Sequence, residues 1–169
     1  MLKKKKVANP KRKMQIAIVA GAIIIGLFIM FNYNLDQAKI SGQSFGDNLA
    51  QIQNDLKDET ANYDLKITQY QNGSITKQNI LQISEKHLAV LGDILSKYNN
   101  LKPPESFAPS LELFKLSTQS QFNSDKLLKE WIQTGDNSTK IRSDQLLGQA
   151  FDYETRALDL FNKAKTNSE

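Results

Sequence analysis

The apolar residues of this chain form one long uninterrupted run near its beginning and helical stripes afterwards. Residues 14–35 contain no charged side chain, and the stretch from Ile16 to Phe31 is wholly apolar. About 20 residues rising about 1.5 Å each cross a hydrocarbon core of about 30 Å. The pattern therefore predicts one transmembrane helix over residues 14–35, held in the lipid bilayer.

Beyond an expected linker at residues 36–44, which can itself be helical, apolar side chains recur every three or four positions, as in amphipathic helices. Ser44, with an acid three residues later, is the expected N-cap of a first helix, which the turn at 72–74 ends. A second helix is expected over residues 76–98. The prolines at 103–104 separate it from the next one.

Two further helices follow. With Ser106 as its N-cap, the third helix has Pro109 where no intrahelical N–H bond is lost, and Gly135 is placed to end it. A residue within 136–138 can cap the fourth helix, which is expected to run to about Lys165. Its apolar residues form two adjacent stripes, which suits packing against more than one neighbour.

These elements predict an all-α fold, in which the transmembrane helix is followed by an up-down-up-down four-helix bundle. The bundle is expected over residues 45–165, with a short tail at 166–169. Because alternate helices run in opposite directions, the turns at 72–74 and 135–138 should lie at the end of the bundle far from the membrane. The loop with the two prolines should lie at the near end.

Charge is divided between the two sides of the apolar run. Residues 1–13 carry seven lysines and arginines and no acid, whereas the rest of the chain has a net charge of −3. The positive-inside rule keeps such a tail in the cytoplasm and places the bundle outside the cell membrane, as in a single-pass signal-anchor protein. Since topology accounts for the basic tail, nucleic acid is not an expected partner.

Two processed leaders are alternatives to a permanent anchor. A secretory signal has an apolar region of about 7–15 residues before a small-residue cleavage site, but this run is longer and no Ala-x-Ala follows it. A type IV prepilin leader generally has a small residue before the cut and a glutamate soon after it. Lys13 would precede the cut here, and the apolar run has no glutamate.

Composition excludes several kinds of site. The chain has no cysteine and one histidine, so it has no disulfide, no thiolate site and no multi-histidine metal site. Neither a nucleophile elbow nor a glycine-rich phosphate loop is found. We therefore expect no catalytic residues, no bound metal and no cofactor, and predict that the protein is not an enzyme.

Three polar residues on inward stripes are the candidate ligand-lining residues. His87 interrupts the apolar stripe of the second helix, while Thr118 and Gln121 make the middle of the third helix's inner stripe polar, as Asp125 does one turn later. They can line a small-molecule pocket, or form a hydrogen-bonded layer that fixes the helix register. By contrast, the acids of the fourth helix, including Glu154, are interspersed with basic residues and are expected on a solvated face.

The candidate modification sites are two N-glycosylation sequons, at Asn72 and Asn137. Both fall in the turns expected at the far end of the bundle, where a glycan would not disturb helix packing.

The stretch 101–107 between helices, and Trp131 to Asp136 before the last one, complete a layout that resembles small prokaryotic single-pass membrane proteins of unknown function. These have an extracytoplasmic antiparallel helical bundle. The bundle is also similar to chemoreceptor sensor modules, which return to the cytoplasm through a second span that is not seen here. The first hypothesis is a membrane-tethered interaction or scaffold module that binds an envelope protein or a second copy of itself. The alternative is a sensor-like module with a small-molecule pocket inside the bundle.

Overall fold

Four α-helices make up the fold in the computed structural model, which describes residues 40–166. They are α2 (Ile40–Gln71), α3 (Lys77–Tyr98), α4 (Ala108–Thr134) and α5 (Asn137–Thr166), with a short 3-10 helix, η1 (Glu105–Phe107), before α4. No strand occurs within this range, so the predicted all-α class and the four-helix bundle are confirmed.

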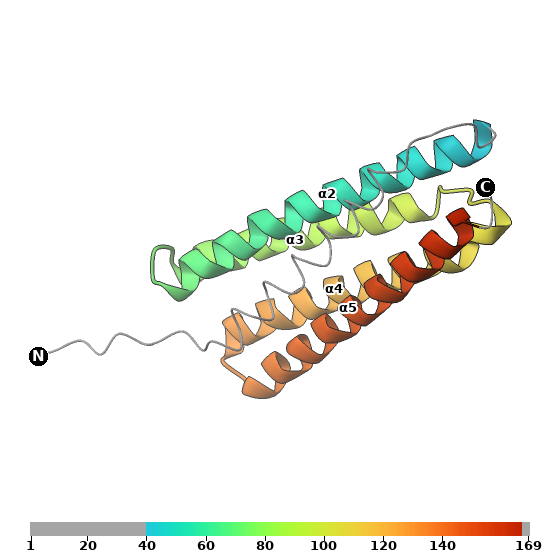
Figure 1. Ribbon diagram of the computed structural model, residues 1–169. Helices are drawn as coiled ribbons and strands as arrows, with labels where there is room; N and C mark the ends of the chain where they lie inside the picture. The colour runs from blue at the N-terminus through green and yellow to red at the C-terminus, as the bar shows by residue number, and fades with distance from the viewer. Residues whose placement is uncertain (1–39, 167–169) are drawn as a thin grey trace, which may run out of the picture.

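The helices alternate in direction along the bundle (Figure 1). The beginning of α2, η1 and the end of α5 lie at one end, which we call the proximal end. The turns α2–α3 and α4–α5 lie together at the other, distal end, as the up-down-up-down prediction requires. In both turns the chain reverses at a glycine with positive φ, Gly73 (81°) and Gly135 (80°), a conformation open to glycine at little cost.

The predicted membrane-spanning segment at 14–35 lies outside the described residues. Among the helices that are described, none is both long enough and apolar enough to cross a bilayer.

Two predicted helix starts are wrong. α2 already includes Ile40, so part of the expected linker is helical and Ser44 is an interior residue rather than an N-cap. Serine costs a helix only a few tenths of a kcal/mol relative to alanine, so Ser44 does not stop one. Ser106 is not the cap of α4 either, because it lies within η1, and Phe107 takes the N-cap position.

The remaining helix ends agree with the sequence. Thr76 caps α3 by accepting a hydrogen bond from the Asn79 backbone N–H (3.2 Å). Asp136 accepts from the Ser138 backbone N–H (2.8 Å) at the start of α5, and α4 ends at Gly135. Pro109 falls in the first turn of α4, where proline displaces no helical hydrogen bond.

The interior has two apolar clusters. The proximal core joins all four helices and η1, and its rings from Phe45, Phe107, Phe114 and Phe161 approach with centroids 5.0–6.4 Å apart. The distal core is smaller, and its fully buried members are Tyr63, Ile67, Ile80 and Ile132. Between the two clusters, the centre of the bundle is polar.

Candidate functional site

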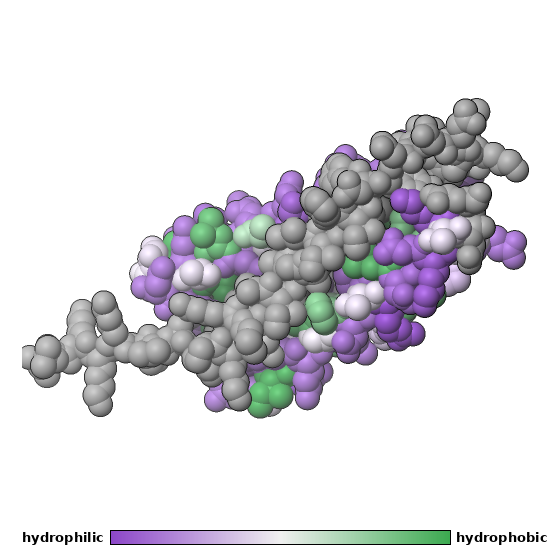
Figure 2. Space-filling view, in the orientation of Figure 1, coloured by the Kyte–Doolittle hydropathy of each residue, from purple (hydrophilic) through white to green (hydrophobic). Residues whose placement is uncertain are grey.

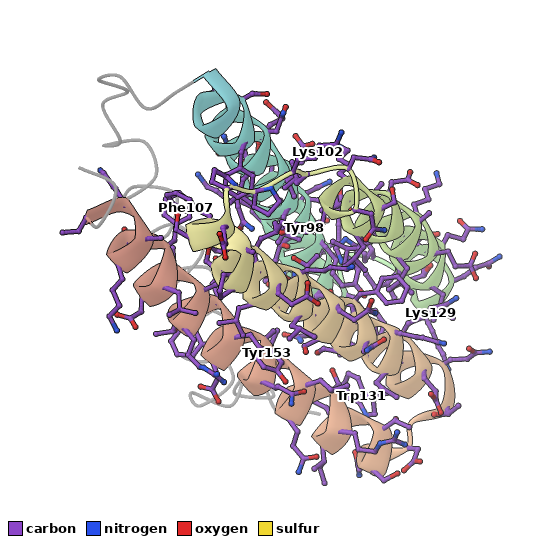
Figure 3. The ribbon with its side chains drawn as sticks, turned by 90° about the vertical axis from the view of Figure 1, so that its right-hand side faces the viewer. Tyr98, Lys102, Phe107, Lys129, Trp131 and Tyr153 are labelled. Atoms are coloured by element: carbon purple, nitrogen blue, oxygen red, sulfur yellow. The ribbon has the colours of Figure 1, made fainter. Side chains whose placement is uncertain are left out.

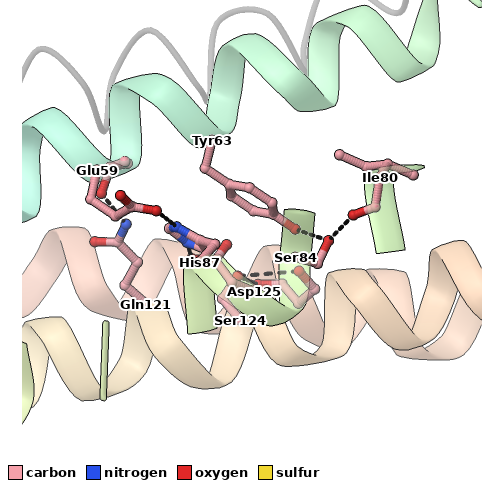
Figure 4. A network of polar contacts seen from close by, with 10 residues as sticks. Glu59, Tyr63, Ile80, Ser84, His87, Gln121, Ser124 and Asp125 are labelled. Atoms are coloured by element: carbon pink, nitrogen blue, oxygen red, sulfur yellow. Dashed lines mark hydrogen bonds and ion pairs between the residues drawn. The ribbon is translucent and has the colours of Figure 1, made fainter. Parts of the chain in front are cut away.

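His87 is the centre of the polar region between the two cores. Its side chain is 1% exposed, and its two ring nitrogens face carboxylates on two other helices. Nδ1 lies 2.8 Å from Glu59 Oε1 of α2, and Nε2 lies 3.1 Å from Asp125 Oδ2 of α4 (Figure 4). The ring also stacks on Tyr63, with centroids 3.9 Å apart and planes 9° from parallel. One imidazole thus connects α3 to both α2 and α4.

The electrostatics of this cluster favour bound protons. Burial by itself lowers the pKa of His87, but the hydrogen bonds and charges of Asp125 and Glu59 outweigh it, so the pKa is raised. Burial raises the pKa of Asp125, although the hydrogen bond and the charge of His87 lower it in part. Half-buried Asp64, next to Tyr63 in α2, has its pKa raised to about 7 by burial and by the charge of Asp125.

Thr118 and Gln121 are buried, as their inward stripe predicts. Gln121 Nε2 donates to Thr60 Oγ1 (2.7 Å), next to Glu59 in α2. Thr118 Oγ1 shares a hydrogen bond of 3.0 Å with the hydroxyl of Tyr98, which also accepts from Gln53 Nε2 (2.8 Å). Figure 3 shows Tyr98 directed from α3 towards α4. We call these residues, with the His87 cluster, the polar layer; its members are Gln53, Glu59, Thr60, Tyr63, Asp64, Ser84, His87, Tyr98, Thr118, Gln121 and Asp125.

The polar layer is closed by its own hydrogen bonds. Among the described residues, every fully buried side-chain nitrogen or oxygen has a hydrogen-bond partner. All three candidate ligand-lining residues therefore belong to a hydrogen-bonded layer, one of the two arrangements their positions allow. An open hollow of about 340 Å³ lies on α5, lined by Arg142, Gln145, Leu146 and Gln149.

Glu154 corrects the prediction of a solvated acidic face. It is buried, at 4% exposure, on the side of α5 that also buries Ala150 and Ala157. Burial raises the pKa of its carboxyl to about 7, while a hydrogen bond from the Ser117 hydroxyl of α4 lowers it. The three- and four-residue steps from Ala150 to Glu154 and on to Ala157 are the signal that could have identified it.

The described residues offer no ready metal site: no group of three or more histidine, aspartate or glutamate side chains there has an arrangement that holds an ion. Imidazole and carboxylate are the usual groups of acid–base catalysis, but that needs a substrate atom within hydrogen-bond reach. In this layer the ring nitrogens already face Glu59 and Asp125. The arrangement can therefore store protons and tie helices together.

The two sequons differ in the folded chain. Asn72 is exposed, and its Oδ1 accepts from the Ser74 hydroxyl (2.6 Å) within the α2–α3 turn. Asn137 is exposed too, but the sequon hydroxyl of Thr139 donates to the Asp136 carbonyl (2.7 Å) and Thr139 is 4% exposed. Asn72 is thus the more accessible of the two predicted modification sites.

Comparisons with protein-family models, with curated proteins and with solved structures gave no match for this chain.

Proposed function

We propose that this protein is a membrane-tethered interaction or scaffold module of the cell envelope, which binds its partner through the outer surface of the bundle. The observation that carries the proposal is the contrast between a closed interior and an open helix face. The polar groups of the interior bind one another, whereas α5 leaves large apolar side chains exposed to solvent.

α5 carries two of the five exposed large apolar residues described, whereas α2, α3 and α4 carry one each (Leu65, Val90 and Leu116). It packs on α4 and η1, and its two predicted stripes include buried Leu158 and Phe161 but also Leu160, which is 36% exposed. Ile141 near its beginning is 59% exposed, the largest value among the exposed large apolar residues described. Figure 2 shows isolated apolar patches on a mostly hydrophilic face, one of them over the beginning of α5.

The hollow on α5 adjoins this exposed residue. Its lining residues begin at Arg142, directly after Ile141, and combine a cation, two amides and the half-buried Leu146. Binding sites between proteins commonly place apolar anchors beside arginine and amide groups. We therefore assign the partner surface to Ile141, Arg142, Gln145, Leu146 and Gln149, and call it the α5 face.

The tether is proposed from the sequence. The uncharged segment 14–35 and the seven cations of residues 1–13 support one span with a cytoplasmic N-terminus and an extracytoplasmic bundle. Protease added to intact cells should digest the bundle and leave the basic tail protected. Release of the full chain by alkaline carbonate would contradict a membrane-spanning anchor.

A site-specific photo-crosslinker tests the α5 face. Introduced at Ile141 in the full-length protein in its native membrane, it should give one abundant crosslinked species, identified by mass spectrometry as an envelope protein or a second copy of the chain. The matched control is the same crosslinker at Lys86, an exposed residue of α3, where the species should be absent.

A substitution separates binding from folding. Ile141→Asp should abolish co-purification of the crosslinked partner and leave the helical circular dichroism unchanged, because surface positions rarely alter stability by more than about 0.5 kcal/mol. Equal crosslinking from positions 141 and 86, or partner binding unaffected by I141D, would contradict the proposed surface.

A further inference from the structure

The contacts of His87 require more protons than a neutral imidazole supplies. A neutral imidazole has one N–H donor and one lone pair, whereas an imidazolium has two donors. Here both nitrogens face a carboxylate oxygen, at 2.8 Å and 3.1 Å. Both contacts are hydrogen bonds only when the ring is an imidazolium or when one carboxyl is protonated. The geometry therefore calls for one additional proton among His87, Glu59 and Asp125, which lie on α3, α2 and α4.

Loss of this proton affects the two contacts unequally. A neutral ring keeps one N–H, and the less exposed carboxylate needs it more because an unpaired buried charge is costly. The side chain of Asp125 is 11% exposed and that of Glu59 is 22% exposed. The remaining N–H thus stays with Asp125, while Glu59 is free to turn towards water.

Among the residues that the structure describes, no cation from a neighbouring helix faces the imidazole in place of the proton. The charged or titratable groups that face the imidazole are Glu59, Tyr63 and Asp64 from α2 and Asp125 from α4. Glu154, the buried carboxyl of α5, lies near Tyr98 instead, where burial and the charge of Glu154 raise the pKa of the Tyr98 hydroxyl. On α3 itself, Glu85 and Lys86 are exposed, and Glu85 pairs with Lys129.

We propose that the polar layer is a proton-operated latch, which binds α2 to the bundle while His87 and its two carboxylates share the additional proton and releases α2 when that proton leaves. The ligand of the layer is thus the proton itself. A bundle outside the cell membrane would meet the pH of its surroundings directly. The latch does not depend on the proposed partner, since all of its parts lie within one chain.

Release of α2 should extend to the distal core. Tyr63 stacks on His87 and hydrogen-bonds Ser84 Oγ (2.9 Å), and it also belongs to the distal core with Ile67. Trp131, the single tryptophan of the chain, packs against that core. The expected consequence is local opening of the distal half of α2, with α4 and α5 still paired.

The chain has one histidine, so its imidazole can be followed without assignment ambiguity. The test uses the full-length protein in lipid nanodiscs, labelled with ¹⁵N at histidine and titrated from about pH 5.5 to about pH 9.5. Both ring nitrogens should carry a proton at neutral pH, and the ring should lose one of these two protons at higher pH. Hydrogen exchange, corrected for the intrinsic effect of pH, should rise roughly tenfold in residues 56–67 of α2 on deprotonation and remain unchanged around Asp125.

Two variants decide between a latch and a passive layer. Glu59→Gln, at the half-buried partner, should lower the pH at which His87 titrates and leave exchange in α2 independent of that titration. The control is Glu85→Gln, which removes an exposed carboxylate from the same helix as His87 and should leave both measurements as in the wild type. An imidazole already neutral at about pH 6 while Glu59 and Asp125 are both ionised overturns the proposal. So does hydrogen exchange in α2 of the wild type that stays constant while His87 titrates.

Discussion

The two ends of the bundle are built differently. Among the described residues, the proximal core contains fourteen buried apolar side chains, drawn from all four helices and η1, whereas the distal core contains four. α5 supplies Phe161 and Leu158 to the proximal core and no residue to the distal one. At the distal end its contacts with α4 include a serine pair, with Ser124 Oγ donating to the Ser143 carbonyl (2.8 Å), and Lys140 Nζ, which lies 5.7 Å from the centre of the Trp131 ring.

This difference indicates which end of the bundle is more stable and which end can unfold locally. Buried apolar area contributes most of the stability of a domain, while a hydrogen bond adds about 1 kcal/mol net. The proximal end should therefore hold the fold together, and local opening should begin at the distal end. The polar layer lies at the boundary between the two ends.

The largest expected effect comes from a cavity in the proximal core. Phe114, which is 0% exposed, contacts the ring of Phe161, so Phe114→Ala should lower the free energy of unfolding by about 3–5 kcal/mol. Chemical denaturation followed by circular dichroism measures it. Ile132→Ala in the distal core is the comparison, and it should mainly increase hydrogen exchange at that end. A greater loss of global stability from Ile132→Ala would reverse the proposed ranking of the two ends.

A smaller and pH-dependent effect is expected at Glu154. Its carboxyl has a pKa raised to about 7 from 4.5, so the folded chain binds a proton that the unfolded chain has lost, and stability falls as pH rises from about 4.5 to about 7. Glu154→Gln removes this penalty. It should raise the unfolding free energy at about pH 8 by up to about 3 kcal/mol and change it little at about pH 4.5.

Thermal unfolding at the two pH values measures the difference, with Glu112→Gln as an exposed control in α4. The raised pKa values of His87 and Asp64 act in the same direction, so the variant should still lose some stability above neutral pH. An E154Q variant with the same stability profile as the wild type would show that the carboxyl is not buried in solution.

The smallest effect is expected at the distal contact of α4 and α5. Ser143→Ala removes the hydroxyl that lies 3.1 Å from Ser124 Oγ but keeps the carbonyl to which Ser124 donates. The unfolding free energy should fall by no more than about 1 kcal/mol. Ser124→Ala, which removes the donor itself, should cost more. If the two substitutions were equally damaging, the side-chain contact rather than the backbone contact would be the important one.

Local sequence signals predicted those parts of the fold that one helix decides by itself. Thr76, Gly135 and Asp136 mark helix ends through groups within a few residues of them. Ser44 and Ser106 misled because a serine near an expected start is compatible with a cap and with the interior of a helix. Whether such a serine caps a helix or lies inside it depends on the conformation of the residues on either side.

The site was less predictable because it depends on how three helices are rotated against one another. The inward positions of His87 and Gln121 follow from the period of their own helices, but Glu59 becomes a partner of His87 only through the register of α2 against α3. The charged neighbours of Glu154 predict a solvent-exposed position, although its spacing from Ala150 places it on the buried side. At this position, the helical period of the apolar residues predicts burial better than the pattern of charges does.

The length of α2 determines how far the proposed partner surface lies from the proximal end of the bundle. Its 32 residues, at about 1.5 Å each, span about 48 Å from the beginning of the described chain to the distal turn. Ile141 lies in the first turns of α5 at that distal end, while α5 ends at the proximal end. If residues 14–35 anchor the chain as proposed, the bundle would act as a spacer that holds its partner surface tens of ångströms above the bilayer.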